Sequence, residues 1–524
     1  MRFRKIYLKN CFTLIIGFAI VLLFFVVIRT YYEIYCREKD IFRPKLSSNN
    51  YSNGKTKQTH IDMKAKEFLF KEAYPTEFEI NSIDMNVNIN KNIKNYIKGS
   101  VDGNSQKIND KINSLDEISD SDDSTSIMKE SIDGSISIER PWYFDGGTRY
   151  PKPATINKKS KKRIAKLFPS EDPLNDRITN QLMFVPPNYQ ELKKQKRFKT
   201  ILLYNGLGAW NVKEGRNMFI NSKCPVNTCK ITGGREHAAK ADLILYKDYF
   251  IPTGVERHPS QIFMLYLLEC PYHTPNIKFP DSFNWTATYR RDSDIVAPYE
   301  KWEYYDPRIK QIEQDRNYAL NKTKKVAWFV SNCGARNGRL QFAHELQKYI
   351  DVDIYGFCGE YKCPRSNAEK CFEVLDHDYK FYLAFENSNC KDYITEKFFV
   401  NALGRNILPI VMGARPEDYA LSAPHRSYIH VDEFTSAKEL AEYLHMLDKN
   451  DELYNSYFKW KGTGEFINTY FWCRVCAMLH DDEFIKKPGK CMIPDINEWW
   501  RAPGVCTNGS WRKEMARKEI MGDD

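Results

Sequence analysis

The distribution of apolar residues divides the chain into three stretches. Residues 11–28 form one uncharged apolar run of 18 residues, residues 29–139 are polar, and from about residue 140 short apolar runs alternate with amphipathic patterns. As a helix, the first run would extend about 27 Å, enough to cross the hydrocarbon core of a bilayer. The pattern therefore predicts a membrane anchor, a stem and a folded body.

Four cations before the apolar run set the orientation expected for the anchor. These are Arg2, Arg4, Lys5 and Lys9. The positive-inside rule keeps such a segment cytosolic. A cleaved signal peptide is the alternative, but the run is long and no small-x-small cleavage site follows it. We expect a single-pass type II protein with a cytosolic tail (1–10), a transmembrane signal-anchor (11–28) and a lumenal body.

Residues 29–139 have the composition of a flexible lumenal stem. Six Asn lie between positions 81 and 95, residues 114–126 are mostly acidic or hydroxylated, and no Trp precedes Trp142. Such a segment cannot bury enough apolar surface to offset the entropy lost on ordering. The sequence therefore predicts a disordered stem that holds the body away from the membrane.

Three apolar runs in the first half of the body predict buried strands, at 200–204, 241–246 and 262–268. The second half alternates strand and helix patterns more clearly. Strands are predicted at 325–330, 352–355, 381–385 and 407–412, and helices at 339–350 and 392–403. Such alternation implies an α/β fold with parallel, doubly wound sheets, whose ligands bind beyond the carboxyl ends of the strands. Two such layers facing each other would leave a cleft for two substrates.

Composition and charge narrow the class of protein. The 524 residues are 42% hydrophobic and 14% aromatic, and the mean hydropathy of −0.58 excludes a polytopic membrane protein. The formal net charge is +10, with basic runs at 158–166 and 193–199. Nucleic-acid binding is one interpretation of these runs, but a solvated connector is favoured in a lumenal protein. No nucleic-acid partner is expected.

The cysteines and sequons fit a lumenal body. All 14 cysteines except Cys11 fall on the predicted lumenal side, where disulfides are the default. Zinc is the alternative for the spacings of Cys224, Cys229, Cys473, Cys476, Cys491 and Cys506. Pairing cannot be deduced from the sequence. The glycosylation candidates are Asn50, Asn284, Asn321 and Asn508.

Polar residues at two predicted strand ends suggest a binding site. They are Asn332, Arg336, Arg339, Glu386, Asn387, Tyr393, Glu396 and Lys397. With Asp392 as N-cap, Tyr393, Glu396 and Lys397 would share one helix face. Cations, amide donors and a helix N-terminus suit a diphosphate, and a carboxylate suits sugar or ribose hydroxyls. The alternative is an ordinary surface ion-pair face.

Two further groups of carboxylates are candidates for chemistry. Glu269 ends the apolar run at 262–268 and is either a solvated residue at a strand end or a general base in the cleft. Asp292 and Asp294 resemble the paired-aspartate metal motif of another glycosyltransferase class. The neighbouring Arg290 and Arg291 favour a different interpretation, in which the aspartates pair with arginines and shape a loop. No bound metal is predicted.

Several segments together resemble α1,3/4-fucosyltransferases. The resemblance rests on residues 385–399 (FENSNCKDYITEKFF), on 283–294 (FNWTATYRRDSD), and on Ser331-Asn332 with Arg339. It covers the body from about residue 199 to 511 and leaves out the anchor and stem. Segments 224–229, 267–273 and 470–476 are similar, more narrowly, to invertebrate enzymes that fucosylate the N-glycan core.

The resemblance implies the glycosyltransferase B fold, in which two Rossmann-like domains face each other across a cleft. The expected domains are 140–310 on the acceptor side and 320–511 on the GDP-fucose side. It also implies an inverting enzyme with GDP-β-L-fucose as donor and Glu269 as base. The residues expected around the donor are Asn332, Arg339, Asn387, Tyr393, Glu396 and Lys397. No tightly bound cofactor is expected, and metal stimulation is left open.

The expected reaction adds α1,3-linked fucose to the Asn-linked core GlcNAc of glycoprotein N-glycans, in the Golgi membrane and on its lumenal side. A Lewis-type α1,3-fucosyltransferase acting on antennal N-acetyllactosamine is the main alternative. A catalytically inactive lumenal lectin on the same fold is a second one. Glu269, Arg339 and Lys397 together disfavour the lectin, because glycan binding alone needs no base.

Overall fold

The computed structural model describes residues 127–130, 136–155, 165–363, 368–481 and 492–513. All of them belong to one compact body within residues 65–524. The predicted anchor at 11–28 and the predicted stem up to residue 126 lie outside the described residues. Within the described ranges, no helix is both long and apolar enough to span a bilayer.

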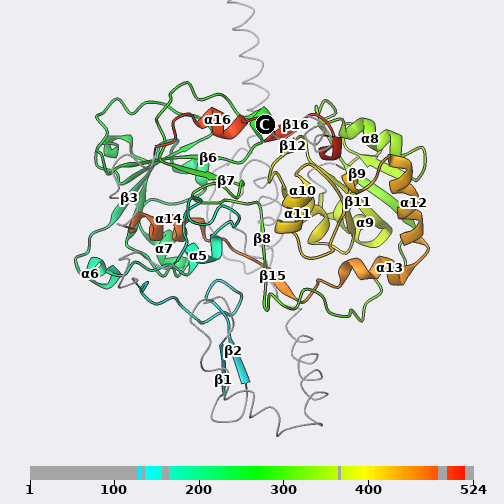
Figure 1. Ribbon diagram of the computed structural model, residues 1–524, viewed down its shortest axis with the longest axis horizontal. Helices are drawn as coiled ribbons and strands as arrows, with labels where there is room; N and C mark the ends of the chain where they lie inside the picture. Colours follow the sequence, from blue (N-terminus) through cyan, green and yellow to red (C-terminus); the bar gives the residue numbers. More distant parts are fainter. Residues whose placement is uncertain (1–126, 131–135, 156–164, 364–367, 482–491, 514–524) are drawn as a thin grey trace, which may run out of the picture. The chain divides into compact units, whose positions relative to one another are not determined.

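The first half of the body forms a five-stranded parallel sheet in the order β4-β3-β5-β6-β7 (Figure 1). Its strands are β3 (Lys199–Leu203), β4 (Cys229–Thr232), β5 (Leu243–Lys247), β6 (Ile262–Leu267) and β7 (Trp285–Thr288). Every residue of β5 and β6 is buried, as expected for parallel strands covered on both faces. The three predicted strands are confirmed, and β4 and β7 are additional.

The second half forms another five-stranded parallel sheet, in the order β10-β9-β11-β13-β14. Its strands are β9 (Lys324–Phe329), β10 (Val352–Tyr355), β11 (Tyr379–Phe385), β13 (Leu408–Met412) and β14 (Ile429–His430). The four predicted strands are confirmed. In each sheet the second strand along the chain (β4 or β10) lies at the edge, beside the first (β3 or β9), and the third strand lies on the other side of the first. The strand order therefore reverses between β3 and β5 and between β9 and β11. In doubly wound sheets such switch points bind ligands.

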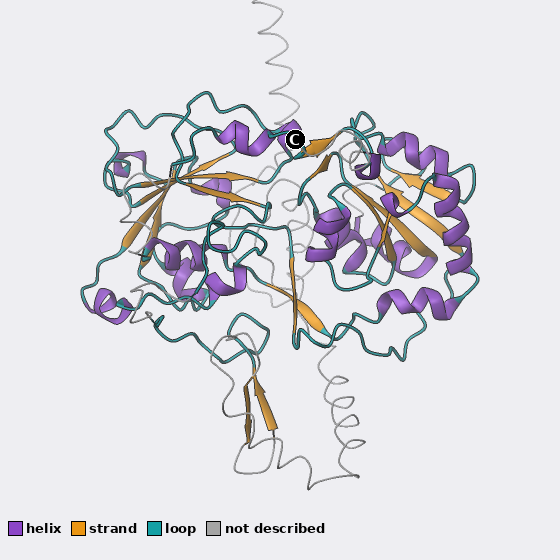
Figure 2. Ribbon diagram, in the orientation of Figure 1, coloured by secondary structure: helices purple, strands orange, loops and turns teal. Residues whose placement is uncertain are grey.

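Helices cover both faces of each sheet (Figure 2). Those of the first half are α5 (Ile178–Leu182), α6 (Tyr189–Lys194) and α7 (Asn217–Asn221), joined by α14 (Phe471–Leu479) and α16 (Ile496–Arg501). Those of the second half are α8 (Arg339–Leu346), α9 (Ala368–Asp378), α10 (Glu396–Phe398), α11 (Pro416–Ser422), α12 (Ala437–Asp448) and α13 (Asp451–Asn455). A π-helical turn (Phe399–Leu403) continues α10.

Alternation along β11 explains how the second sheet is covered on two sides. Phe381, Leu383 and Phe385 face the cluster that contains α8 and α12, whereas Tyr382 and Ala384 face the cluster that contains α9 and α11. α12 has a matching apolar stripe, and the Ser436 side chain caps its first turn by accepting a hydrogen bond from the Glu439 N–H.

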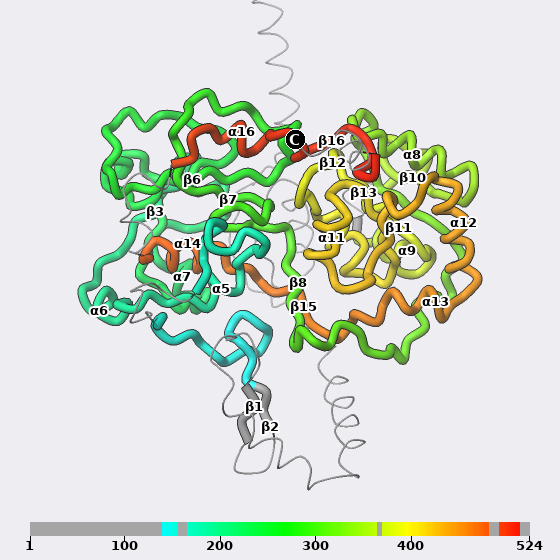
Figure 3. Tube along the Cα trace, viewed as in Figure 1, coloured from blue at the N-terminus to red at the C-terminus, as the bar shows by residue number. Residues whose placement is uncertain are grey.

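The chain passes between the two sheets twice, and the two passages pair with each other. β8 (Lys301–Tyr304) leads from the first sheet toward the second, and β15 (Gly464–Ile467) leads back; they form an antiparallel ribbon. The return is visible in Figure 3, where the orange-red end of the chain runs among the green strands. A second ribbon joins β12 (Asn389–Cys390) to β16 (Cys506–Thr507).

The core of the first sheet takes residues from three separate parts of the chain. It includes Trp142 and Phe168, which precede β3, and Val475 and Trp500, which follow β15. The sequence assigned all of 320–511 to the second domain, but α14 and α16 pack on the first sheet, where Val475 and Trp500 join its core. Local patterns missed this return, because a helix does not reveal which sheet it covers.

The end of the predicted stem contains two short strands. β1 (Ile127–Glu130) and β2 (Ile136–Glu139) pair in antiparallel register. This part of residues 29–139 therefore differs from the disorder expected of the stem.

Candidate active site

Residues from both sheets meet at the carboxyl ends of their strands. Glu269 follows β6 of the first sheet. Asn332 and Arg339 follow β9, and Asn387, Tyr393, Glu396 and Lys397 follow β11 of the second. The two groups after β9 and β11 lie on either side of the switch point of the second sheet.

Glu269 is the point of contact between the two groups. Its side chain is 54% exposed, and its Oε2 accepts a hydrogen bond of 3.2 Å from the Tyr393 hydroxyl. Burial holds the pKa of Tyr393 well above its usual range, so this hydroxyl stays protonated and acts as the donor. His273 Nδ1 lies 3.8 Å from the same carboxylate oxygen. The arrangement leaves a solvent-accessible carboxylate with a fixed orientation.

Cys270 anchors the loop that carries Glu269. This buried thiol lies 3.1 Å from the Ser388 hydroxyl and 3.3 Å from His273 Nδ1. Burial raises the pKa of Cys270, which keeps it a neutral thiol. The segment after β11 therefore contacts the loop after β6 at two neighbouring positions.

Lys397 lies at the centre of an ion-pair cluster at the start of α10. Its Nζ is 3.3 Å from Glu386 Oε2, 2.9 Å from Glu396 Oε1 and 3.0 Å from Thr395 Oγ1. Burial alone would lower the pKa of Lys397, but the two carboxylates together outweigh it and raise this pKa. Lys397 is therefore a fixed cation, and about a quarter of its side chain remains exposed.

Glu386 also belongs to this cluster; it was among the polar residues predicted at the strand ends but not among those expected around the donor. It is fully buried, and it accepts hydrogen bonds from the Thr395 N–H at 2.8 Å and the Thr395 hydroxyl at 2.9 Å. Burial raises its pKa, and Lys397 opposes that shift. The sequence pattern that indicates a site at Glu386 is its position directly after a strand whose seven residues are all buried.

Arg339 is enclosed at the first turn of α8 and joins the ends of two strands. Its Nη1 donates to the Phe385 carbonyl at 2.9 Å and its Nη2 to the Asn332 carbonyl at 3.0 Å, while its buried Nε has no partner among the described residues. Burial lowers the pKa of Arg339, and the nearby charge of Glu386 opposes this shift. A guanidinium nevertheless stays charged at neutral pH. Arg339 thus supplies a buried positive charge and connects the loop after β9 to the end of β11.

The two candidate amides differ in their surroundings. Asn332 is exposed, and its Oδ1 accepts a hydrogen bond of 3.1 Å from the Gly334 N–H. Asn387 Oδ1 is buried without a partner in the described part of the chain. A buried acceptor without a partner is costly and is a common feature of ligand sites. Arg336, which lies in the same loop as Asn332, is exposed.

The predicted N-cap of the helix after β11 is wrong. The helix begins at Glu396, and Thr395 caps it by accepting a hydrogen bond from the Lys397 N–H. Asp392 instead has a positive φ of 59° and pairs with Arg291 at 2.5 Å. Tyr393 therefore precedes the helix and does not share a helical face with Glu396 and Lys397. Pattern reasoning failed because Asp and Thr are both good caps, and the contact with Arg291 is tertiary.

The paired aspartates have separate structural partners. Asp292 forms a two-point ion pair with Arg290, at 2.9 and 2.5 Å, and lies 3.2 Å from Lys391 Nζ. Asp294 Oδ2 instead accepts hydrogen bonds from the Thr286 N–H at 2.8 Å and the Thr286 hydroxyl at 3.0 Å. The predicted arginine pairing is confirmed for Asp292, and Asp294 binds a threonine.

Two clusters of potential metal ligands occur among the described residues. In one, Cys229 and Cys476 lie near His480, but the two sulfurs form a disulfide. In the other, Glu269 and His273 surround Cys270, whose neutral thiol is a weak ligand.

The described residues form five disulfides, as predicted for these cysteines. They are Cys224–Cys473, Cys229–Cys476, Cys333–Cys358, Cys363–Cys371 and Cys390–Cys506. Two attach α14 to the first sheet, one fixes the loop that carries Asn332, and one joins β12 to β16. The zinc alternative for the paired cysteines is therefore wrong, and Cys491 lies outside the described residues.

The sequons differ in accessibility. Asn321 and Asn508 are exposed. Asn284 is half-buried, its Oδ1 accepts a hydrogen bond of 2.8 Å from the Phe263 N–H, and its Nδ2 contacts Met492. A glycan on Asn284 would have to displace these contacts. Asn50 lies outside the described residues.

Two family models match successive parts of the chain. Residues 196–300 match the family model "Fucosyltransferase, N-terminal", and residues 319–499 match "Glycosyltransferase family 10 (fucosyltransferase) C-term". The chain is 68% identical over 390 residues to Glycoprotein 3-alpha-L-fucosyltransferase A of Drosophila melanogaster, covering 74% of this chain and 77% of that protein. It is 34% identical over 324 residues to Alpha-(1,3)-fucosyltransferase C of the same species, covering 56% and 73%.

A solved α1,3-fucosyltransferase with GDP-fucose is 17% identical, with a TM-score of 0.36, covering 54% of this chain and 91% of that one. The sequence matches define the class. The chain belongs to glycosyltransferase family 10, the fucosyltransferases. The family predicted from the motifs is confirmed.

Proposed function

We propose that this protein transfers L-fucose from GDP-β-L-fucose, in α1,3 linkage, to the Asn-linked core GlcNAc of glycoprotein N-glycans. The relative with 68% identity is named a glycoprotein 3-alpha-L-fucosyltransferase, which favours a glycoprotein acceptor. Identity to the Alpha-(1,3)-fucosyltransferase C is half as high, at 34%. Transfer to antennal N-acetyllactosamine remains the alternative that the experiment below distinguishes.

We assign residues 140–310 to the acceptor side and 320–511 to the donor side, except that α14 and α16 pack with the acceptor side. This is the arrangement of the glycosyltransferase B fold. It is supported by the clustering of Lys397, Arg339 and Asn387 at the switch point of the second sheet. Glu269 belongs to the first sheet and meets that cluster through Tyr393.

The observation that carries the proposal is the hydrogen bond from Tyr393 to Glu269. It holds an accessible carboxylate against the segment after β11, the same segment that carries Lys397. A general base must lie within hydrogen-bond reach of the acceptor hydroxyl, and a departing diphosphate needs positive charge close to it. This hydrogen bond therefore links the proposed base to the segment that supplies positive charge for the diphosphate.

The proposed reaction is a single displacement. Glu269 accepts the proton of the GlcNAc 3-hydroxyl while that oxygen forms a bond to fucose C1. The bond between C1 and the diphosphate oxygen breaks, and its electron pair leaves with GDP. Attack opposite the leaving group converts the β-linked donor into an α-fucoside.

The residues after β9 and β11 are proposed to surround the donor. Lys397 and Arg339 would stabilise charge developing on the diphosphate, and Glu396 would stabilise positive charge on the sugar. Asn332 and Asn387 would bind donor hydroxyls or amides. Asn387 Oδ1 and Arg339 Nε are enclosed, so a ligand would reach them after a small side-chain movement.

The proposed setting is the Golgi lumen, with the body held to the membrane by one span at residues 11–28. The partners are GDP-fucose and the N-glycans of glycoprotein acceptors. No tightly bound cofactor is proposed, and GDP-fucose acts as a substrate.

The test compares Glu269→Gln with the full-length wild-type protein, using GDP-fucose and either an N-glycan core glycopeptide or N-acetyllactosamine. Glutamine keeps the size of the side chain but cannot accept a proton at neutral pH. We expect kcat to fall by about 10²–10⁴-fold while GDP affinity stays nearly intact. Glu442→Gln on α12, where Glu442 is 67% exposed and faces Lys438, is the matched control.

Each outcome has a separate meaning. If Glu269→Gln keeps more than about a tenth of kcat, the base lies elsewhere. If the wild-type protein fucosylates only N-acetyllactosamine, the acceptor assignment is wrong. If it turns over no GDP-fucose with either acceptor, the lectin alternative replaces the enzyme.

A further inference from the structure

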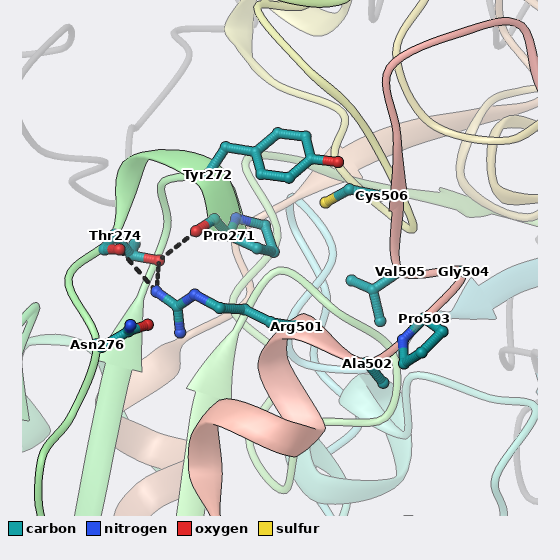
Figure 4. Close-up of a pocket in the computed structure, with 10 residues that line it drawn as sticks. All are labelled: Pro271, Tyr272, Thr274, Asn276, Arg501, Ala502, Pro503, Gly504, Val505 and Cys506. Atoms are coloured by element: carbon teal, nitrogen blue, oxygen red, sulfur yellow. Dashed lines mark hydrogen bonds between the residues drawn. The ribbon is translucent and has the colours of Figure 1, made fainter.

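A pocket of about 450 Å³ opens beside the loop that carries Glu269 (Figure 4). One wall is formed by residues 271–276, directly after Glu269, and the other by residues 501–506, after α16. Its volume falls within the range of about 300–1,000 Å³ typical of small-molecule sites. It is distinct from the cluster around Lys397, none of whose residues lines it.

The two walls are fixed to one another. Arg501 Nη2 donates to the Thr274 carbonyl at 2.6 Å, and Trp500 Nε1 donates to the Thr274 hydroxyl at 2.8 Å. Cys506 is joined by a disulfide to Cys390 in the segment that leads to Tyr393. The pocket is therefore preformed, and it is attached to both sides of the proposed active site.

The pocket lies close to the proposed base. Pro271, which lines it, follows Glu269 by two residues, a chain distance of roughly 7 Å at most. The pocket wall and the proposed base therefore belong to the same short loop, so an acceptor whose hydroxyl reaches Glu269 has this opening as a neighbouring place for its adjacent ring.

The lining suits a sugar ring better than a phosphate. Tyr272 is 41% exposed and Asn276 is exposed at the same wall. Figure 4 shows both side chains. Aromatic faces and amides provide apolar contact and oriented hydrogen bonds, the combination found in pockets for neutral polar ligands. The cation of the pocket, Arg501, already donates to three oxygens of Thr274 and Pro275.

We propose that this pocket binds the sugar ring attached through O4 of the acceptor GlcNAc. The proposal rests on the proposed function. The reacting hydroxyl is O3, and O3 and O4 are borne by adjacent ring carbons, so the ring linked at O4 must lie beside the reaction centre. In an N-glycan core that ring is a second, β1,4-linked GlcNAc. Tyr272 supplies the apolar face for it and Asn276 binds its polar substituents.

The test uses the full-length enzyme with an N-glycan glycopeptide as acceptor, and it measures inhibition by N,N′-diacetylchitobiose and by N-acetylglucosamine. In the wild type, the two-ring sugar is expected to inhibit at least tenfold more strongly than the one-ring sugar. In Tyr272→Ala the ratio of the two inhibition constants should fall about tenfold, or about 1.4 kcal/mol, and the acceptor KM should rise by a similar factor. Tyr272→Phe keeps the ring and should retain most of the preference.

Tyr349 follows α8 in the second half of the body and does not line the pocket. Tyr349→Ala removes a tyrosine of similar exposure (40%) and serves as the control. Melting temperatures of all variants show whether each is folded. If the wild type fails to fucosylate the glycopeptide, the proposed function fails. If the wild type transfers fucose but prefers neither inhibitor, or if Tyr272→Ala retains the preference and the acceptor KM, the pocket proposal is overturned.

Discussion

The Tyr393 hydroxyl donates a hydrogen bond to Glu269 Oε2 across 3.2 Å, although 124 residues separate them along the chain. Tyr393 follows β11 of the second sheet and Glu269 follows β6 of the first. The carboxylate proposed as base is therefore oriented by a residue of the proposed donor side. This contact couples the geometry of the two halves at the point where the acceptor and donor would react.

Removing only this hydroxyl should slow the chemical step. In Tyr393→Phe the ring still packs against Tyr289, with centroids 5.1 Å apart in the wild type, but Glu269 loses its donor. Hydrogen bonds to charged groups contribute about 1.5–3 kcal/mol, so we expect kcat to fall by roughly tenfold or more. The measurement is steady-state transfer at saturating donor and acceptor, with the melting temperature recorded in parallel.

Tyr419→Phe is the matched control for this substitution. Tyr419 is also buried in the second half of the chain, and its hydroxyl has no hydrogen-bond partner among the described residues. Its kcat should stay close to the wild-type value. An unchanged kcat in Tyr393→Phe would show that Glu269 does not depend on this contact.

Lys397→Ala should weaken GDP binding as well as turnover. Free GDP retains the diphosphate that Lys397 is proposed to bind. The substitution also leaves Glu386, which is fully buried, without its cation. Breaking a buried pair typically costs about 3–5 kcal/mol, so the free energy of unfolding should fall too. Calorimetric titration with GDP and chemical denaturation measure the two effects separately.

Lys438→Ala provides the comparison, because Lys438 is 64% exposed and lies 3.8 Å from Glu442. Exposed pairs contribute about 0–1 kcal/mol, so neither quantity should change much. GDP affinity that survives Lys397→Ala intact would argue against the second sheet as the donor side.

Asp294→Asn should stabilise the protein at neutral pH. Burial raises the pKa of Asp294 to about 6, above its ordinary value of 3.8, so the folded state holds the proton that the unfolded chain has released between these values. Ionisation of Asp294 therefore opposes folding as the pH rises, and fully so above about pH 6. Asparagine cannot ionise, and its oxygen can accept both hydrogen bonds from Thr286. We expect a gain of up to about 3 kcal/mol at pH 7.5.

Asp292→Asn should behave in the opposite way. Burial would raise the pKa of Asp292, but its hydrogen bonds and ion pairs with Arg290 and Lys391 together outweigh burial and lower it. Its charge therefore stabilises the fold above the unfolded pKa, and the substitution should lower the melting temperature at pH 7.5. Melting curves at pH 4.5 and 7.5 test both variants. A uniform loss of stability in Asp294→Asn at both pH values would contradict the assignment.

A shortened chain that begins at Arg140 should fold, whereas one that begins at Lys199 should not. Trp142, Phe168 and Leu182 are buried in the core of the first sheet. Losing a buried side chain of this kind costs about 1.5–3 kcal/mol each, and whole domains are stable by only about 5–15 kcal/mol. Secretion behind a cleavable signal, followed by a melting curve and a transfer assay, compares the two chains.

The polar contacts of Arg177 support the same boundary. Arg177 is 1% exposed, and its Nη2 donates to the carbonyls of Arg291 and Ser293 at 2.6 and 2.7 Å. These carbonyls belong to the loop that contains Asp292 and Asp294. Efficient folding of the chain that begins at Lys199 would show that residues 140–198 are dispensable.

Much of the α/β framework was predictable from local sequence. Buried parallel strands are continuous apolar runs, so β5, β6 and β11 could be recognised without any tertiary information. Shorter or edge strands such as β4 and β14 were missed, because four or two residues give too weak a pattern. The placement of candidate residues at strand ends followed from the same runs.

The sequence by itself determined the alternation of strands and helices, the family, and which carboxylate follows β6. Only the tertiary structure decided that Tyr393 reaches Glu269, that Thr395 rather than Asp392 caps α10, and that α14 returns to the first sheet. The first group depends on neighbours within a few residues, whose spacing fixes the periodicity of each element. The second depends on contacts over roughly one hundred residues or more, whose energies appear only after both sheets have packed.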